Sequence, residues 1–303
     1  MTQAPATDEQ VIKDAERIIL GGRCVAFLGA GVSIPPGEQW KMLVEEIAER
    51  CDVPTEGIPL PIVIDQCINK DLTSCNDILR EKLHRYSSGI RPVVSSLMRL
   101  PFRAILTTNF DPWVHSESVA KWQRSVFVYP DLPLGEGLNR GLYYLHGYYD
   151  SDSKNSCIRR LVFGEESFER AYHGSLLEGF LLQVLTYESI LFVGFDPTEE
   201  RFATILGKAA RIRRHIMDDR GPVGPPRRFA LWALPYAQND VERAEQASNI
   251  SHLRSLDLEV VLYDREGETW RGLDRLVDRW VEEGDPQCKR APFRSGFEPG
   301  SDE

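Results

Sequence analysis

The chain has 303 residues, of which 42% are hydrophobic and 27% are charged, and this composition indicates a soluble globular protein. No apolar stretch approaches the ~20 residues that span a bilayer, and Met1–Asp8 shows no basic cluster followed by an apolar run, so we expect no membrane segment, no secretory signal and a cytoplasmic location. The net charge of −10 argues against direct sequence-specific nucleic-acid binding, which relies on Lys and Arg, and the basic run from Arg201 to Arg214 is interpreted as a solvated or partner-facing helix surface.

The first half of the chain predicts one strand and several helices. Apolar residues recur at helical spacing over Val11–Ile19, and Cys24–Leu28 has the pattern of a short buried strand. A helix is predicted over Trp40–Cys51. Further helical patterns without a convincing strand follow between Pro59 and Met98, so we predict a helical insertion at about 55–100 that could cover an active site. Its helical patterns are Ile62–Cys67, Ile78–Leu83 and Val93–Met98.

The second half alternates strand and helix patterns. Such alternation predicts an α/β fold with a doubly wound, mainly parallel, Rossmann-like sheet, built by one domain over residues 8–284. Residues 218–227 are predicted to form a loop, and 285–303 a disordered tail. The predicted strands are Ala104–Thr107, Ser125–Val128, Leu142–Leu145, Ile190–Val193, Phe229–Leu234 and Leu258–Tyr263, and the predicted helices are Leu176–Leu185, Arg201–Ile212 and Val241–Ala247.

The six cysteines are scattered and include no C-x-x-C pair. Cys24 falls inside an apolar strand pattern. We therefore predict neither a zinc site nor a disulfide framework, and no metal ligand is assigned.

A glycine turn, Gly29-Ala30-Gly31-Val32-Ser33, follows the first strand. Exposed N–H groups in such a turn and the positive end of the next helix can hold a diphosphate. Ile34 stands where a dehydrogenase fingerprint has its third glycine, so an ordinary dehydrogenase is a poor fit. A turn that merely joins a strand to a helix is the competing interpretation.

Three more strand ends deliver polar residues. Thr107-Thr108-Asn109-Phe110-Asp111 offers an amide and a carboxylate, although such residues also form turns that cap helices. His146 ends another strand and could accept a proton from a ribose hydroxyl near neutral pH, although a lone histidine is more often structural. Gly194 and Asp196 follow a fourth. Because ligands bind at the carboxyl ends of strands in open α/β sheets, we expect these residues to share one pocket.

Taken in order, G-A-G-V-S at 29–33, T-T-N-F-D at 107–111, L-H-G at 145–147 and V-G-F at 193–195 resemble the motif series of the sirtuin superfamily, over roughly residues 10–265. The chain resembles most the bacterial antiphage branch, in which the domain degrades NAD⁺. By that resemblance, Gly29, Ala30, Gly31 and Ser33 would bind the pyrophosphate and the nearby ribose of NAD⁺, and Val32, Thr108, Gly194 and Asp196 would also belong to the NAD⁺-binding site. Asn109, Asp111 and His146 would be catalytic: Asn109 and Asp111 would hold the nicotinamide ribose and the carboxamide, and Asn109 or His146 would position the attacking group.

Two departures from the family pattern shape the expected activity. Deacetylase sirtuins carry a four-cysteine zinc module after the catalytic histidine, whereas 147–189 holds only Cys157, which weakens a deacetylase interpretation. The degrading branch often has G-x-S-x-x-D near the fourth strand, but Asp196 and Glu199 stand in the serine and aspartate positions here.

We therefore expect an NAD⁺ hydrolase that releases nicotinamide and ADP-ribose. The alternatives are an NAD⁺-dependent deacylase or ADP-ribosyltransferase, and a non-catalytic NAD⁺ or nucleotide sensor. Because unrestrained NAD⁺ hydrolysis is toxic, we expect gating by homo-oligomerisation or by a partner. The family resemblance suggests a HerA-type ATPase or an Argonaute-like protein as that partner.

Overall fold

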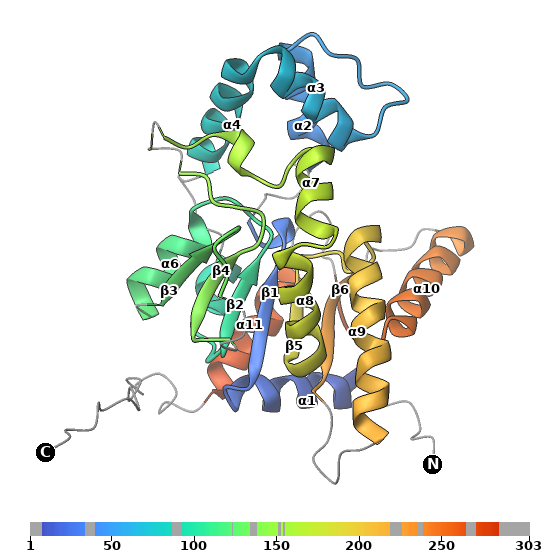
Figure 1. The fold of residues 1–303 in the computed structure, drawn as a ribbon. Helices are drawn as coiled ribbons and strands as arrows, with labels where there is room; N and C mark the ends of the chain where they lie inside the picture. Colours follow the sequence, from blue (N-terminus) through green and yellow to red (C-terminus); the bar gives the residue numbers. More distant parts are fainter. Residues whose placement is uncertain are drawn as a thin grey trace, which may run out of the picture.

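The computed structural model describes residues 8–33, 40–86, 92–122, 124–133, 138–150, 153, 155–218, 226–234, 239–264 and 271–284. Its centre is a seven-stranded sheet of order β3-β4-β2-β1-β5-β6-β7, in which every neighbouring pair is parallel (Figure 1). The predicted α/β fold with a parallel, doubly wound sheet is confirmed. The strands are β1 (Cys24–Leu28), β2 (Ala104–Thr107), β3 (Ser125–Val128), β4 (Gly141–Tyr144), β5 (Ser189–Val193), β6 (Arg228–Leu234) and β7 (Glu259–Asp264).

The strand order places β1 beside the switch point of the sheet, where the addition of successive strands changes from one side of β1 to the other. From β1 the chain continues to β2 on one side, and later to β5 on the other. In open α/β sheets, ligands bind beyond the carboxyl ends of the strands at such a switch point. Leu28, Thr107 and Val193 end these three neighbouring strands, so the residues that follow them meet at one edge.

Helices cover both faces of the sheet, which explains why its central strands are apolar throughout. Alternate residues of β1 enter two different cores, with Cys24 and Ala26 in one and Val25 and Phe27 in the other. The first core includes residues of α1 (Asp8–Leu20), α5 (Pro92–Leu97), α6 (Trp113–Trp122) and α11 (Arg271–Glu283). The second includes residues of α8 (Leu176–Tyr187), α9 (Glu200–Asp218) and α10 (Asp240–Ser255).

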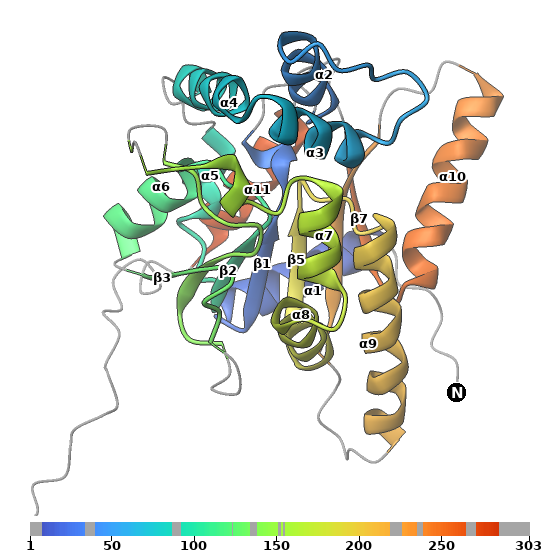
Figure 2. The same ribbon diagram turned by 45° about the horizontal axis from the view of Figure 1, so that its top comes forward.

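A third core forms above the carboxyl ends of the strands. It joins α2 (Trp40–Arg50), α3 (Leu60–Lys70) and α4 (Leu72–Tyr86), and we call these three helices the helical layer. Figures 1 and 2 show them gathered beyond one end of the sheet, with α7 (Glu165–Tyr172) between them and α8.

The segment that follows β4 ties the helical layer to the sheet. Tyr149, Ile158 and Phe163 belong to the third core. The Asn76 side chain of α4 accepts a hydrogen bond from the Ile158 N–H (2.8 Å), and the Tyr149 hydroxyl donates to the Asn76 carbonyl (3.2 Å). The Tyr149 N–H donates to the carbonyl of Phe110, just beyond β2 (2.8 Å).

Most predicted strands and helices lie within a residue or a turn of their observed bounds. α6, α7 and α11 were not predicted. The helical layer differs in its members from the predicted insertion at about 55–100. It includes α2, which precedes that range, whereas α5, which lies within the range, packs against α11 in the first core. α9 continues to Asp218, which shortens the predicted loop at 218–227, and both 219–225 and the predicted tail at 285–303 lie outside the described residues.

Among the helices that the structure describes, none combines the length and apolar character needed to cross a membrane.

Candidate active site

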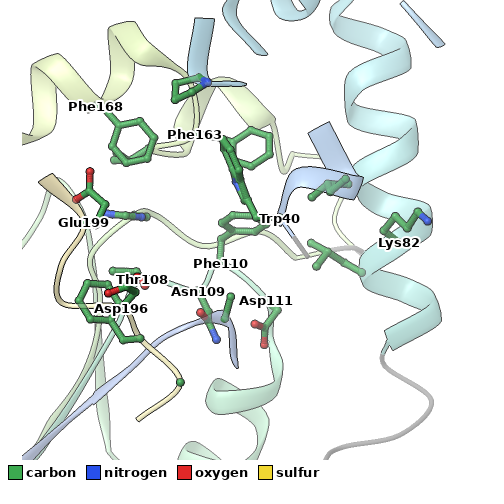
Figure 3. Close-up of a pocket in the computed structure, with 18 of the residues that line it drawn as sticks. Trp40, Lys82, Thr108, Asn109, Phe110, Asp111, Phe163, Phe168, Asp196 and Glu199 are labelled. Carbon is green, nitrogen blue, oxygen red and sulfur yellow. The ribbon is translucent and has the colours of Figure 1, made fainter. Parts of the chain in front are cut away.

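A cavity of about 630 Å³ lies between the carboxyl ends of the strands and the helical layer (Figure 3). Three sets of residues line it. The strand ends contribute Ala30, Thr108, Asn109, Phe110, Asp111, Trp113, His146, Gly194, Phe195 and Asp196; the helical layer contributes Trp40, Met42, Leu43, Glu46, Pro61, Lys82 and Leu83; and the region of α7 and α9 contributes Val162, Phe163, Phe168, Tyr172, Glu199 and Arg201.

The glycine turn after β1 packs directly on the loop after β5. Residues Ala30–Val32 form a short 3-10 helix. A Cβ at Gly194, whose φ is +60°, would lie 2.6 Å from the Val32 nitrogen, and one at Gly31 would lie 2.9 Å from the Gly194 Cα. Only glycine permits this approach, because real Cβ atoms essentially never come within 3.0 Å of such neighbours. Gly31 and Gly194 therefore allow the backbones of the turn after β1 and the loop after β5 to pack directly against each other.

Most amides of this turn are already used inside the protein. The Gly29 N–H donates to the Val193 carbonyl (3.0 Å) and the Gly31 N–H to the Gly194 carbonyl (2.9 Å). The N–H groups of Val32 and Ser33 also donate within the turn. Ala30 is exposed and lines the cavity. Within the described part of the turn, the expected contact with a diphosphate is therefore narrowed to the surroundings of Ala30. Residues 34–39, which follow the turn, lie outside the described residues.

Asn109 is held at the end of β2 by contacts with the glycine turn. Its Nδ2 donates to the Ser33 hydroxyl (2.8 Å) and to the Gly29 carbonyl (3.1 Å), while its own N–H donates to the Thr107 hydroxyl (3.0 Å). The side chain is buried, yet Oδ1 receives no hydrogen bond from any described residue. A buried acceptor without a donor costs about 1–3 kcal/mol, which a ligand hydroxyl or amide would recover.

Asp111 both caps a helix and reaches the cavity. Its Oδ1 accepts from the Trp113 N–H at the start of α6 (3.0 Å), which is the structural role expected of an Asp in such a turn. The Ser33 hydroxyl also hydrogen-bonds the carboxylate. Burial nevertheless raises the pKa of Asp111 to about 6, against these two stabilising hydrogen bonds. The carboxylate is therefore ionised at neutral pH but can take up a proton just below it.

His146 follows β4 and lies in an aromatic setting. Its Nε2 is 2.7 Å from the Tyr172 hydroxyl, and the rings of Phe168 and Tyr172 meet it edge to face at 5.5 and 5.7 Å. Burial among these rings lowers the pKa of His146 to about 3. The ring is thus neutral at physiological pH, and the predicted proton uptake near neutral pH is not favoured in the ligand-free protein.

Acidic residues follow β5. The Asp196 Oδ1 accepts from both the N–H (2.9 Å) and the hydroxyl (2.7 Å) of Thr198, which closes a tight turn. The Glu199 Oε2 accepts from the Phe202 N–H at the start of α9 (3.0 Å). Arg201 lies 2.5 Å from the Glu165 carboxylate and 3.6 Å from that of Glu199. This guanidinium is therefore paired before any ligand arrives.

The opposite wall is mainly apolar. Phe163 makes edge contacts with Trp40 (5.7 Å between ring centroids) and with Phe110 (5.5 Å). In Figure 3, Trp40 and Phe163 lie across the cavity from Asn109 and Asp111. Lys82 at the rim pairs with Glu46 (2.6 Å). This wall offers flat apolar surfaces to a planar ring.

Across the described residues no cluster of three or more His, Cys, Asp or Glu side chains is arranged to hold a metal. The cysteines there are free thiols, and Cys51 Sγ lies 3.6 Å from Cys75 Sγ.

Of the site residues predicted from sequence, seven line the cavity: Ala30, Thr108, Asn109, Asp111, His146, Gly194 and Asp196. Gly29, Gly31, Val32 and Ser33 lie behind it, and Gly29 and Ser33 contact Asn109. Sequence reasoning did not find Trp40, Phe163 or Tyr172. The spacing of Phe168 and Tyr172, four residues apart in α7, is a signal that places both side chains on one helix face.

Residues 103–253 match the family model described as the SIR2-like domain. No curated protein matches the chain. The matched segment contains Asn109, Asp111, His146 and Gly194, whereas the glycine turn that contacts Asn109 and Gly194 lies before it. SIR2-like domains use NAD⁺ and form a superfamily of NAD-dependent enzymes. The family match and the parallel α/β sheet together indicate a sirtuin-like domain with an NAD-related function in this chain.

Proposed function

We propose that this protein is an NAD⁺ hydrolase that cleaves the bond between nicotinamide and ribose and releases ADP-ribose. The observation that carries the proposal is the buried, unpaired Oδ1 of Asn109, set beside Asp111 and within the same cavity as His146. NAD⁺ brings the donors that this oxygen lacks, in its ribose hydroxyls and its carboxamide N–H groups.

The size and walls of the cavity are consistent with this substrate. Its volume of about 630 Å³ lies within the range of about 300–1,000 Å³ typical of small-molecule and cofactor sites. The polar strand ends would face the ribose, and the rings of Trp40, Phe110 and Phe163 would suit a planar base.

The chemistry requires little of the protein. Nicotinamide is bound through a positively charged nitrogen, so it leaves as a neutral molecule and needs no acid, unlike the leaving groups of ordinary glycosides. The electrons of the broken C–N bond go to the nicotinamide nitrogen, a water oxygen bonds to the ribose carbon, and one proton is released. The site must therefore stabilise a ribosyl cation and position one water.

The described side chains divide this work between them. Asn109 Oδ1 would hold a ribose hydroxyl or the attacking water by accepting a hydrogen bond from its O–H group. The Asp111 carboxylate stabilises positive charge developing on the ribose, and its pKa of about 6 suits it to accept the proton that water loses. His146, with its low pKa, would act as a neutral hydrogen-bonding group at neutral pH.

We also propose that the activity is restrained until the protein assembles or meets a partner, as part of an abortive antiphage response. A HerA-type ATPase or an Argonaute-like protein is the suggested partner by family resemblance. This part of the proposal fails if the isolated protein turns over fully at every concentration.

The decisive experiment follows NAD⁺ by mass spectrometry. Purified protein is incubated with NAD⁺ over a range of protein concentrations, with and without the products of adjacent genes, and with and without an acylated peptide. We expect nicotinamide and ADP-ribose independent of the peptide. A cyclic product would differ from ADP-ribose in mass by one water. Peptide-dependent turnover would instead indicate a deacylase or a transferase, and intact, bound NAD⁺ under every condition would indicate a sensor.

Matched variants connect the activity to the cavity. Asn109→Ala and His146→Ala are expected to lower turnover by at least about 100-fold, because each removes a group that contacts the reacting ribose or water. Asn249→Ala and His252→Ala change the same residue types on the exposed face of α10 and should leave turnover unchanged. Equal activity in all four variants would contradict the proposed site.

A further inference from the structure

We propose that Tyr172 is a positioning residue that fixes His146 in the tautomer with its proton on Nδ1, so that His146 presents a hydrogen-bond donor to the substrate rather than a base. The inference rests on the proposed NAD⁺ hydrolase function for its kinetic consequences. Its structural part stands on the geometry around the two side chains alone.

The first observation is that the hydroxyl of Tyr172 is buried. Tyr172 is only 5% exposed, and its phenol must place an O–H in an apolar setting beside Phe168. Among the described residues, the hydrogen-bonding group that it contacts is His146 Nε2, at 2.7 Å. A buried O–H without an acceptor is costly, so the arrangement that satisfies it has the phenol donate to Nε2.

A neutral imidazole carries one proton. If Nε2 accepts from Tyr172, the proton must lie on Nδ1. Nδ1 makes no hydrogen bond with any described residue. It is not fully buried, and the ring lines the cavity, so Nδ1 is accessible from there. Nδ1–H is therefore the group that His146 offers to a ligand oxygen.

Ionisation of the pair is disfavoured, which keeps this arrangement in place. Burial lowers the pKa of His146 and raises the pKa of Tyr172, so that neither a charged imidazole nor a phenolate forms at neutral pH. The charged groups that act on Tyr172 are Glu199, just before α9, and Arg201 within it, and Arg201 is paired with Glu165 of α7 and with Glu199. The pair thus acts as two neutral dipoles of fixed direction.

The backbone on both sides holds the ring in place. The His146 carbonyl accepts from the Val162 N–H (2.9 Å), and a Cβ at Gly147, whose φ is +88°, would meet the Arg160 carbonyl oxygen at 2.8 Å. Tyr172 itself is anchored by α7, which follows this same segment. The ring and the hydroxyl are therefore positioned by one continuous stretch of chain that runs from the end of β4 to α7.

The proposal changes the role expected of His146. A donor can hydrogen-bond a ribose or diphosphate oxygen, but it cannot accept the proton of the attacking water. That task falls to Asp111, the carboxylate that follows β2 beside Asn109, because Asp196 is used in the turn with Thr198. The step remains balanced, because the water proton moves to the Asp111 carboxylate and then to solvent.

The structural test is nitrogen NMR of the histidine ring in the full chain labelled with ¹⁵N-histidine, with the signal assigned through His146→Ala. We expect the wild-type ring to be neutral and protonated on Nδ1 at pH 7, and Tyr172→Phe to shift it towards the Nε2-protonated form. A wild-type ring protonated on Nε2, or shifts that do not change in Tyr172→Phe, would overturn the inference. Tyr143→Phe is the matched control, because it deletes a phenol that donates to the Asn139 carbonyl (3.1 Å) and should leave His146 unchanged.

The kinetic test separates positioning from a merely structural role. Tyr172→Phe should lower kcat about tenfold or more, change KM less than about threefold, and have no further effect in a His146→Ala background. His146→Asn, whose side-chain N–H stands about as far from the backbone as Nδ1–H, should retain at least about tenfold more activity than His146→Ala. Additive losses, or no advantage of Asn over Ala, would overturn the donor role.

The two tests fail independently. A protein that shows the expected tautomer and its shift, yet leaves NAD⁺ intact, would refute the proposed function while the placement of the proton by Tyr172 stands. An active enzyme with the other tautomer would refute this inference while the hydrolase stands.

Discussion

The two walls of the cavity are built in different ways. The wall at the strand ends is polar, and its side chains are fixed by hydrogen bonds across neighbouring strands and loops, such as those of Asn109 to Ser33 and Gly29. The wall of the helical layer is largely apolar, and Trp40 contacts the ring of Phe163 edge to face there. Under the proposed function, the sheet would supply the chemistry, whereas the helical layer would supply enclosure and shape. Substitutions on the two walls should therefore affect different kinetic constants.

The largest effects are expected on the strand-end wall, where Asp111 joins Asn109 and His146. Asp111→Asn keeps the acceptor for the Trp113 N–H but removes the charge and the proton acceptor. We expect kcat/KM at pH 7.5 to fall by about 100-fold, which corresponds to about 2.7 kcal/mol. In the wild type, kcat/KM should fall as the pH drops through about 6, the pKa of this carboxyl, and the variant should lack that decline. An unchanged acid limb in the variant would show that another group titrates.

Stability measurements provide the control for that pKa. Because the folded-state pKa is raised, the ionised carboxylate disfavours the folded state, so its contribution to stability is greatest below the ordinary value near 3.8 and is lost as the pH rises through about 6. Relative to Asp111→Asn, the wild type should lose roughly 2–3 kcal/mol of unfolding free energy between pH 4 and pH 7. Parallel stability curves for the two proteins would show that the pKa of Asp111 is ordinary.

An intermediate effect is expected where the two loops of the strand-end wall meet. Gly194→Ala introduces a Cβ only 2.6 Å from the Val32 nitrogen at a positive φ, so the two loops must separate. Gly57→Ala is the matched control, because its φ is also positive (+71°) but no atom lies within 4 Å. We expect about 1 kcal/mol of destabilisation for the control and about 2 kcal/mol more for Gly194→Ala, measured by denaturant unfolding. Equal losses would mean that the close contact is unimportant.

The smallest effect is expected on the helical layer. Trp40→Leu keeps an apolar side chain but removes the flat surface beside Phe163. We expect KM for NAD⁺ to rise about threefold to tenfold with kcat nearly unchanged, because this wall binds without taking part in bond cleavage. Tyr187→Leu, which also replaces an aromatic ring by leucine but at an exposed position outside the cavity lining, serves as the control. A fall in kcat with constant KM would assign Trp40 to the chemistry and remove the contrast between the two walls.

The strand-end wall could be predicted from the sequence because each of its motifs lies within a short stretch of chain. Each of the four motifs is an apolar strand followed by polar residues, and parallel strands bring their carboxyl ends to one edge. Asn109, Asp111 and His146 could therefore be expected in one pocket from their positions alone. α11 also has a readable stripe, with Leu273, Val277, Trp280 and Val281 on one face, but no helix was predicted there.

The helical-layer wall and the His146–Tyr172 pair could not be predicted in the same way. Periodicity in α2 and α7 shows that one face is apolar, but it does not show whether that face meets a core or a cavity. The pairing of His146 with Tyr172 joins residues that are 26 positions apart and depends on how α7 packs over β4. The hydrogen bonds of the Gly29 and Gly31 amides to the end of β5 and to the residue after it likewise depend on the neighbouring strand and not on the glycine pattern.

The position of β1 within the sheet bears on what counts as the functional unit of this protein. The segment that matches the SIR2-like domain begins at residue 103, after β1, yet β1 lies between β2 and β5, which are both inside the match. A protein shortened to residues 103–253 would leave a gap in the middle of its sheet and would remove Ser33, the hydrogen-bond partner of Asn109 and Asp111. The smallest autonomous form of this sheet must therefore include residues before 103, which lie outside the segment matched to the SIR2-like domain.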